Sequence, residues 1–178
     1  RARAHRALER GEADFEVGAT IWDQGRDVRY VATDPFVVTH DHLILQAGGS
    51  MTFEGCETLA GVTVHGVRGY SYPCDDVMTL KGMADERALI QRLHRGDIFI
   101  AIVEATVAAY WAKRLDAEIV IGPHMSTAEI VIKLLPRWGD LAPRLNAAIA
   151  ALNAEGAIAG IKARYLREAG LEPAIATN

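Results

Sequence analysis

The chain has 178 residues, 50% of them apolar, which is enough to bury a real core in one domain or in two small lobes. Its net charge is −4 and its basic residues are scattered, so no nucleic-acid surface is indicated. No apolar run approaches the roughly 20 residues of a membrane-spanning helix. The charged opening RARAHRALERGEADF is unlike a signal peptide and lacks an initiator methionine. We therefore expect a processed or trimmed product, with any secretory leader lying upstream.

Strands and helices are predicted to alternate along the chain, which indicates the α/β class. Asp85 and Asp140 each precede a predicted helix as N-caps, and Pro143 falls in the first turn of the second, where its missing N–H costs least. The segment 78–82 has no clear pattern. In chain order we expect a helix over 1–10, strands over 15–21, 28–31, 36–38 and 42–46, a helical turn over 56–60, a strand over 61–67, a helix over 86–95, a strand over 98–103, a helix after Glu104, strands over 119–121 and 128–135, and helices over 140–153 and 157–168.

The stretch Ile98–Val103 gives the clearest prediction of a buried strand in the sequence. Its six apolar residues do not alternate with polar ones, so we expect a strand buried on both faces, as in a parallel sheet covered by helices. Glu104 follows at the carboxyl end of this strand, where open α/β sheets bind their ligands. This carboxylate is therefore either a ligand contact or an acid at the N-terminus of the next helix.

The order of the elements indicates two lobes. Residues 61–121 form a strand–helix–strand–helix–strand unit that extended segments flank on both sides, at 42–46 and 129–134. Two extended crossings around a compact unit are typical of a two-lobed protein with paired hinge strands.

Four segments, in order, carry a family resemblance. ALERGEADFEVGATIWDQGRDVRYVATDPF, LAGVTVHGVRGYSYP, LIQRLHRGDIFIAIVEATVAAY and APRLNAAIAALNAEGAIAGIKARYL each resemble a motif of the periplasmic solute-binding proteins of the polar amino-acid type. The resemblance covers most of the chain. It implies an α/β, two-lobed, type 2 periplasmic-binding-protein-like fold.

Such proteins open with a strand–helix–strand unit that this sequence lacks. The resemblance therefore implies an incomplete first lobe, formed by 1–44 and 128–178, and a whole second lobe, 45–127. We expect either a fragment or a sheet edge that a partner chain covers, because an unpaired strand invites edge pairing and self-association.

The resemblance also implies ligand-binding residues. Arg26 lies in the turn where the family grips a ligand carboxylate, and a guanidinium suits that task. Gly69, Tyr70 and Ser71 occupy the position of a loop whose hydroxyl and N–H groups meet the carboxylate, although Tyr70 departs from the pattern. Glu104 falls where an acid holds the ligand ammonium. The alternatives are an exposed turn arginine, an ordinary connecting loop and a helix-terminal acid.

Two further residues belong to the same proposed site. Thr20 is the only hydroxyl in the strand end Gly18–Ile21, where the family often has several, which weakens an α-amino acid as the ligand. Trp22 could stack on a ligand or simply pack.

Metal and cofactor chemistry is not indicated. His40 and His42 would face the same side of a strand, but they lack an evident third ligand, and His65 suits packing. Cys56 and Cys74 either form a disulfide in an oxidising compartment or remain two thiols.

The leading hypothesis is a periplasmic, non-catalytic protein that closes its lobes on a small polar or amino-acid-like solute and delivers it to a transporter permease or sensor. No nucleophile–base pair, phosphate loop or metal cluster is evident. The alternatives are an enzyme on the same scaffold, resembling a cyclohexadienyl dehydratase with Glu104 as general acid, or a ligand-sensing module of a larger receptor.

Overall fold

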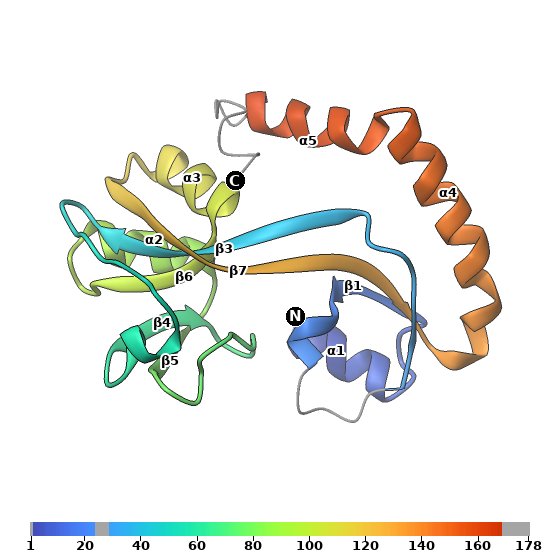
Figure 1. The fold of residues 1–178 in the computed structure, drawn as a ribbon, viewed down its shortest axis with the longest axis horizontal. Coiled ribbons are helices and arrows are strands. Elements are labelled where there is room, and N and C mark those ends of the chain that lie inside the picture. The colour runs from blue at the N-terminus through green and yellow to red at the C-terminus, as the bar shows by residue number, and fades with distance from the viewer. Residues whose placement is uncertain (1, 24–28, 169–178) are drawn as a thin grey trace. The chain divides into compact units, whose positions relative to one another are not determined.

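The computed structural model describes residues 2–23 and 29–168 (Figure 1). Its helices are α1 (Ala2–Glu9), α2 (Glu86–His94), α3 (Ala105–Leu115), α4 (Ala142–Ala154) and α5 (Ala157–Glu168), with 3₁₀ turns η1 (Thr20–Asp23), η2 (Cys56–Leu59) and η3 (Pro136–Leu141). The strands are β1 (Phe15–Ala19), β2 (Val31–Ala32), β3 (Val37–Gln46), β4 (Thr63–Val67), β5 (Thr79–Met83), β6 (Ile100–Glu104) and β7 (Ile119–Leu134). None of the described helices is long and apolar enough to cross a membrane.

The chain divides into two compact units. Unit 1 takes the described residues of 1–39 and 128–164, and unit 2 those of 40–127 and 165–178. Two of the three boundaries fall inside the long strands β3 and β7, which continue from one unit into the other, and the third falls inside α5. The assignment of these units to the two lobes of a binding protein stays a proposal.

Unit 1 is built around the end of β7. β1 pairs with it in antiparallel register, with Val17 opposite Ile132, and β2 also pairs with β7. Lys133 on β7 is buried, and its Nζ donates a hydrogen bond of 2.8 Å to the carbonyl of Ala19. This carbonyl ends β1, so the lysine ties the end of the strand to its neighbour. No sequence pattern predicted a buried lysine here.

The turn η3 explains why one predicted cap is wrong. Asp14 accepts hydrogen bonds from Arg137 at 2.6 Å and from the indole nitrogen of Trp138 at 2.8 Å. These contacts hold residues 136–141 in a 3₁₀ turn. Helix α4 therefore starts only at Ala142, with Leu141 rather than Asp140 at its N-cap position.

Unit 2 is a mixed sheet in the order β7-β3-β6-β4-β5. β3 runs antiparallel to β6, whereas β4 lies parallel to both β6 and β5. The residues 100–103 are buried, which confirms a strand covered on both faces, but this strand begins at Ile100 rather than Ile98, and Phe99 is 47% exposed. Ile100 and Ile102 belong to one apolar cluster, and Ala101 and Val103 belong to the other.

Helices cover only one of these two faces. α2 and α3 supply side chains to the cluster around Ile44, and the predicted Asp85 cap of α2 is confirmed, since its carboxylate accepts from the Ala88 N–H at 2.8 Å. The other face is closed by η2, by the segment 70–78 and by a disulfide between Cys56 and Cys74. The expectation of helices on both faces is therefore wrong.

Three strands differ from the prediction. β3 runs without a break over Val37–Gln46, where two separate strands over 36–38 and 42–46 were predicted. The segment 79–83, which lacked a pattern, pairs with β4 as β5. β7 continues through Gly122 and Pro123, where a strand end was predicted. In unit 2 this strand is at the sheet edge, so the missing N–H of the proline leaves no ladder bond unmade.

Gly122 supplies a test of this edge packing. A Cβ at this position would lie 2.5 Å from the carbonyl oxygen of Leu43, a backbone atom on the neighbouring strand. We expect Gly122→Ala to lower the free energy of unfolding by about 1–3 kcal/mol, the usual cost of overpacking. Urea titration followed by circular dichroism measures it.

Gly160→Ala is the matched control, because a Cβ there meets nothing within 4 Å and the position is helical. It should leave stability unchanged or raise it by up to about 1 kcal/mol. Equal stability of the Gly122→Ala variant and the wild type would contradict the packing described for β7.

Candidate functional site

Three parallel strands of unit 2 end at the same edge of the sheet. Their last residues are Val67 of β4, Met83 of β5 and Glu104 of β6. After them come the loop 68–74, the first turn of α2 and the first turn of α3. Since ligands of open α/β sheets bind beyond the carboxyl ends of the strands, this edge is the candidate site.

Glu104 stands at the end of β6 and caps α3. Its Oε2 accepts a hydrogen bond of 2.8 Å from the N–H of Val107, so the role of helix N-terminal acid is observed. The side chain is partly exposed. Asp41 on β3 lies opposite it in the register, a neighbour that the sequence alone could not supply. One capping bond leaves carboxylate oxygen capacity for a solute ammonium.

The loop after β4 places Gly69, Tyr70 and Ser71 together. Gly69 has φ 83°, in the left-handed region that favours glycine. The hydroxyl of Tyr70 donates to Oε1 of Glu86 at 3.0 Å, which fastens the loop to the first turn of α2. Within the residues that the structure describes, the Ser71 hydroxyl has no hydrogen-bond partner. It is therefore available to a solute.

Tyr72 holds the loop 68–74 against the end of β4. Its hydroxyl accepts a hydrogen bond of 2.8 Å from the N–H of Val67, the last residue of β4. The ring lies against Gly66, where an added Cβ would come within 2.5 Å of Cε2. Burial raises the pKa of Tyr72, and the charges of Asp41 and Glu86 add to that rise, while the bond from Val67 opposes it. Both carboxylates therefore act electrostatically on this loop.

Unit 1 holds the remaining predicted site residues. Thr20 begins η1 at the end of β1, and its side chain is exposed. Arg26 and the side chain of Trp22 lie outside the part of the chain that the structure describes. Within unit 2, the loop with Gly69, Tyr70 and Ser71 and the residue Glu104 both follow strands that end at the same edge of the sheet, whereas Thr20 belongs to unit 1.

A histidine cluster lies on β3 and β7 within unit 2. The ring of His124 is 5.7 Å from that of His40 and 5.4 Å from that of His42, and Thr127 contacts His40 and His124. The sequence did not predict that His124 would join His40 and His42, because His124 lies on a strand that is distant in sequence. No group of three or more His, Cys, Asp or Glu side chains could hold a metal ion among the described residues.

His65 is a packed histidine, as predicted. It is buried, with Nδ1 at 3.3 Å from the carbonyl oxygen of Ile100. Burial lowers its pKa, and the charges of Lys81 and Arg92 lower it further, while the bond to Ile100 opposes this. The neutral imidazole belongs to the core and not to the candidate site.

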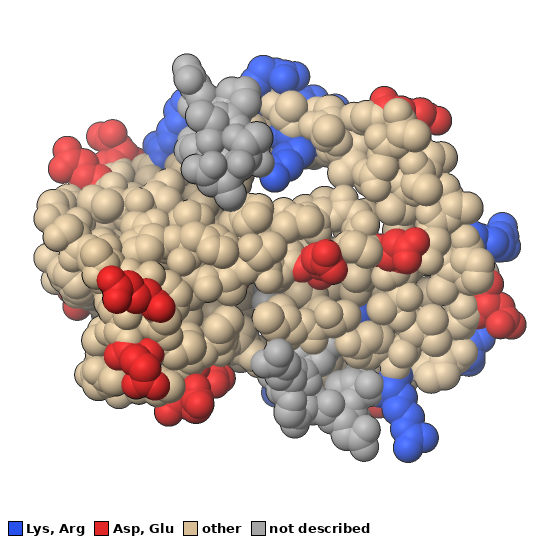
Figure 2. All heavy atoms as spheres, in the orientation of Figure 1, with Lys and Arg blue, Asp and Glu red and all other residues tan. Residues whose placement is uncertain are grey.

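Both acidic and basic groups surround the site, since Arg68 begins the loop 68–74 and Arg87 lies in the first turn of α2. Asp41, Glu86 and Glu104 lie at or near the carboxyl edge, and Asp85 caps the adjacent helix. On the face drawn in Figure 2, the part that is unit 2 shows several acidic groups and few basic ones. Within this edge, the neighbouring carboxylates of Glu104 and Asp41 suit the positively charged group of a solute.

Solved structures resemble this chain in fold, although no protein-family model and no curated protein matches its sequence. The GluR0 ligand-binding core in complex with L-glutamate is 17% identical, covering 90% of this chain and 76% of that one, with a TM-score of 0.73. The amino acid ABC transporter substrate-binding protein AbpA of Streptococcus pneumoniae, bound to L-arginine, is 16% identical, covering 94% and 73%, with a TM-score of 0.72. AncCDT-1, an ancestral amino acid-binding protein and precursor of cyclohexadienyl dehydratase, is 14% identical, covering 87% and 69%, with a TM-score of 0.65.

The fold is that of the type 2 periplasmic binding proteins. The fold class that the four sequence segments predicted is therefore confirmed. At these identities the likeness concerns the periplasmic-binding-protein fold itself, and most of the similar structures are binding proteins rather than enzymes.

The raised pKa of Tyr72 predicts a loss of stability in alkali. The unfolded chain ionises its tyrosines near about pH 10, whereas the folded chain keeps the Tyr72 proton above that pH. The contribution of this group is therefore complete below about pH 10 and is lost as the pH rises beyond it. Phenolate absorbance of the wild type minus that of Tyr72→Phe should show no ionisation of Tyr72 until the protein unfolds. A difference that titrates near pH 10 in the folded protein would contradict its burial.

Proposed function

We propose that this chain is a periplasmic solute-binding protein that closes two lobes, 1–44 with 128–178 and 45–127, on a small polar or amino-acid-like solute. The observation that carries the proposal is that the parallel strands β4 and β6 end at the same sheet edge, so that the loop with Ser71 and the carboxylate of Glu104 both follow strands that end there. Solved structures similar in fold include a substrate-binding protein bound to L-arginine and an ancestral amino acid-binding protein.

Each residue has a role that fits its chemistry. The Ser71 hydroxyl and the backbone N–H of Gly69 donate to the solute carboxylate, while the N–H of Tyr70 donates to the carbonyl of Val67 at 3.1 Å and shapes the loop. Glu104 accepts from the solute ammonium while it still caps α3. Arg26, Thr20 and Trp22 complete the site from the first lobe, with Arg26 as a second carboxylate contact and Trp22 as a stacking surface.

The carboxylates beside Glu104 favour a solute with a positively charged group. Asp41 and Glu86 add negative potential beside Glu104, and both act on Tyr72 within the same loop. A solute with an extra positive group, such as L-arginine, gains from this potential, whereas L-glutamate is repelled.

A conservative substitution of Glu104 tests the site. Glu104→Gln keeps an oxygen that accepts from Val107 and removes the charge. We expect affinity for a cationic amino acid to fall about tenfold or more, because a hydrogen bond to a charged group contributes about 1.5–3 kcal/mol. Isothermal calorimetry with L-arginine, L-glutamine and L-glutamate measures it.

Glu118→Gln is the matched control, since this exposed acid lies outside the site. It should leave the affinity as in the wild type. Unchanged affinity in the Glu104→Gln variant, or preference for L-glutamate over L-arginine, would contradict the assignment.

Delivery of the solute to a transporter permease is the proposed biological role, with ligand sensing for a larger receptor as the alternative. AbpA is named as an ABC transporter protein and GluR0 as a ligand-binding core, so both uses occur on this fold. Enzymatic dehydration is less well supported. Glu104 is partly exposed and engaged in capping, which suits binding better than proton transfer in a sealed site.

Self-association through unit 1 is part of the same proposal. Phe15 and Val17 of β1 are 60% and 51% exposed, and β1 pairs with no strand but β7 in the described part of the chain. Such an open, apolar edge pairs readily with a second copy.

A lysine on this edge should abolish the association. We expect size-exclusion chromatography with light scattering to show a dimer for the wild type and a monomer for Val17→Lys, because an edge charge blocks strand pairing. Val38→Lys, at an exposed valine of β3, is the control and should stay dimeric. A wild-type monomer at every accessible concentration would overturn this part of the proposal.

A further inference from the structure

We propose that the disulfide between Cys56 and Cys74 positions the loop 68–74 for solute binding, so that its reduction weakens solute affinity without unfolding unit 2. This inference rests on the proposed function, because it concerns the regulation of the same site.

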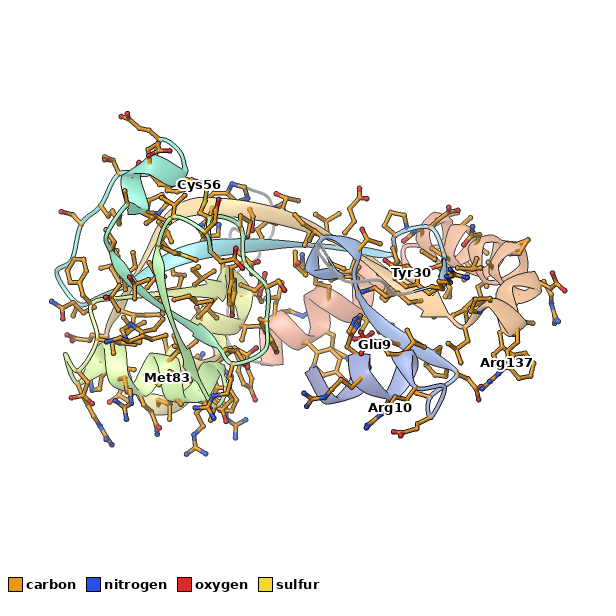
Figure 3. All side chains as sticks on the ribbon, turned by 90° about the horizontal axis from the view of Figure 1, so that it is seen from below. Glu9, Arg10, Tyr30, Cys56, Met83 and Arg137 are labelled. Carbon is orange, nitrogen blue, oxygen red and sulfur yellow. A yellow bond between two sulfur atoms is a disulfide. The ribbon has the colours of Figure 1, made fainter. Side chains whose placement is uncertain are left out.

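The disulfide joins the loop to the helix-free face of the sheet. Cys56 begins η2, and Cys74 ends the loop that carries Gly69 and Ser71. The two Cα atoms are 5.2 Å apart across 18 residues of sequence. In Figure 3 Cys56 lies on one side of unit 2 and Met83 on the other, in agreement with their places in the two apolar clusters. The covalent tie therefore acts from the side opposite α2.

The disulfide restrains an unfavourable backbone conformation at Cys74. Cys74 has φ 66°, a left-handed conformation that costs free energy in a residue with a Cβ. Its carbonyl also accepts hydrogen bonds from the N–H groups of Val77 and Met78, both at 3.1 Å. Once the sulfur–sulfur bond is broken, one restraint on this unfavourable conformation is lost, and the end of the loop can relax.

The remaining anchors limit how far the loop can loosen. Tyr72 still bonds the end of β4 and packs on Gly66, and Tyr70 still donates to Glu86. Leu59, which follows Cys56 in η2, is fully buried in the same apolar cluster. Reduction should therefore free the Cys74 end of the loop and leave the sheet intact. A looser loop weakens binding, because the solute must then order it.

The reaction is a thiol–disulfide exchange with an external dithiol. The dithiol delivers two electrons and two protons to the sulfurs of Cys56 and Cys74, giving two thiols, and is itself oxidised to a disulfide. Cys56 is only partly buried, so a reductant can reach this end of the bond.

The test compares the oxidised chain, the chain reduced with dithiothreitol and the double variant C56S/C74S. Calorimetry with L-arginine should show about tenfold weaker affinity after reduction, because ordering one backbone residue costs that much. Hydrogen exchange of the amides of residues 69–72 and 74 should become faster, while amides of β6 stay protected. The double variant should match the reduced chain and should not respond to dithiothreitol.

Equal affinity and equal exchange before and after reduction would overturn the inference, and so would a loss of protection throughout unit 2. A failure of the proposed function is seen separately. If the oxidised chain binds neither L-arginine nor any other solute of a broad library, that function is wrong. The exchange rates of residues 69–72 and 74 then still decide whether the disulfide positions the loop, and unchanged rates would show that it does not.

Discussion

The parallel pairing of β4 with β6 and β5 is the constraint on which the candidate site depends. Parallel strands point their carboxyl ends the same way, so the loop 68–74 and Glu104 leave the sheet at one edge, although they are far apart in sequence. The antiparallel neighbour β3 then brings Asp41 to the same edge, opposite Glu104. The chemistry of the site thus follows from strand order and direction before any side chain is considered.

Burial on both faces of the sheet makes the strands that carry the loop 68–74 and Glu104 rigid. Ile100 and Ile102 face one apolar cluster and Val103 faces the other, and a fully buried side chain of this kind contributes roughly 1.5–3 kcal/mol. A few specific contacts hold the loop 68–74 to the sheet, chiefly the hydrogen bond of Tyr72 and the disulfide of Cys74. A rigid sheet with a loop held at a few points is a common arrangement for ligand sites.

Local patterns in the sequence predicted much of this. The unbroken apolar run at 98–103, the Asp85 cap and the acid at the end of β6 depend on neighbours in sequence, and the structure contains all three. The family motifs predicted the fold. The partner of Glu104 and the third histidine, His124, could not be predicted, because strand register joins residues more than 60 positions apart.

Other features could not be predicted from the sequence because they depend on tertiary packing. Whether Gly122-Pro123 ends a strand depends on whether that strand lies at an edge, and the burial of Lys133 depends on where the Ala19 carbonyl comes to lie. The most direct test of the central claim is a titration of the ¹⁵N-labelled protein with L-arginine, followed by amide chemical shifts. We expect the largest changes within unit 2 at residues 68–72 and at the start of α3. Changes confined to other parts of unit 2, with these residues unmoved at saturation, would contradict the claim.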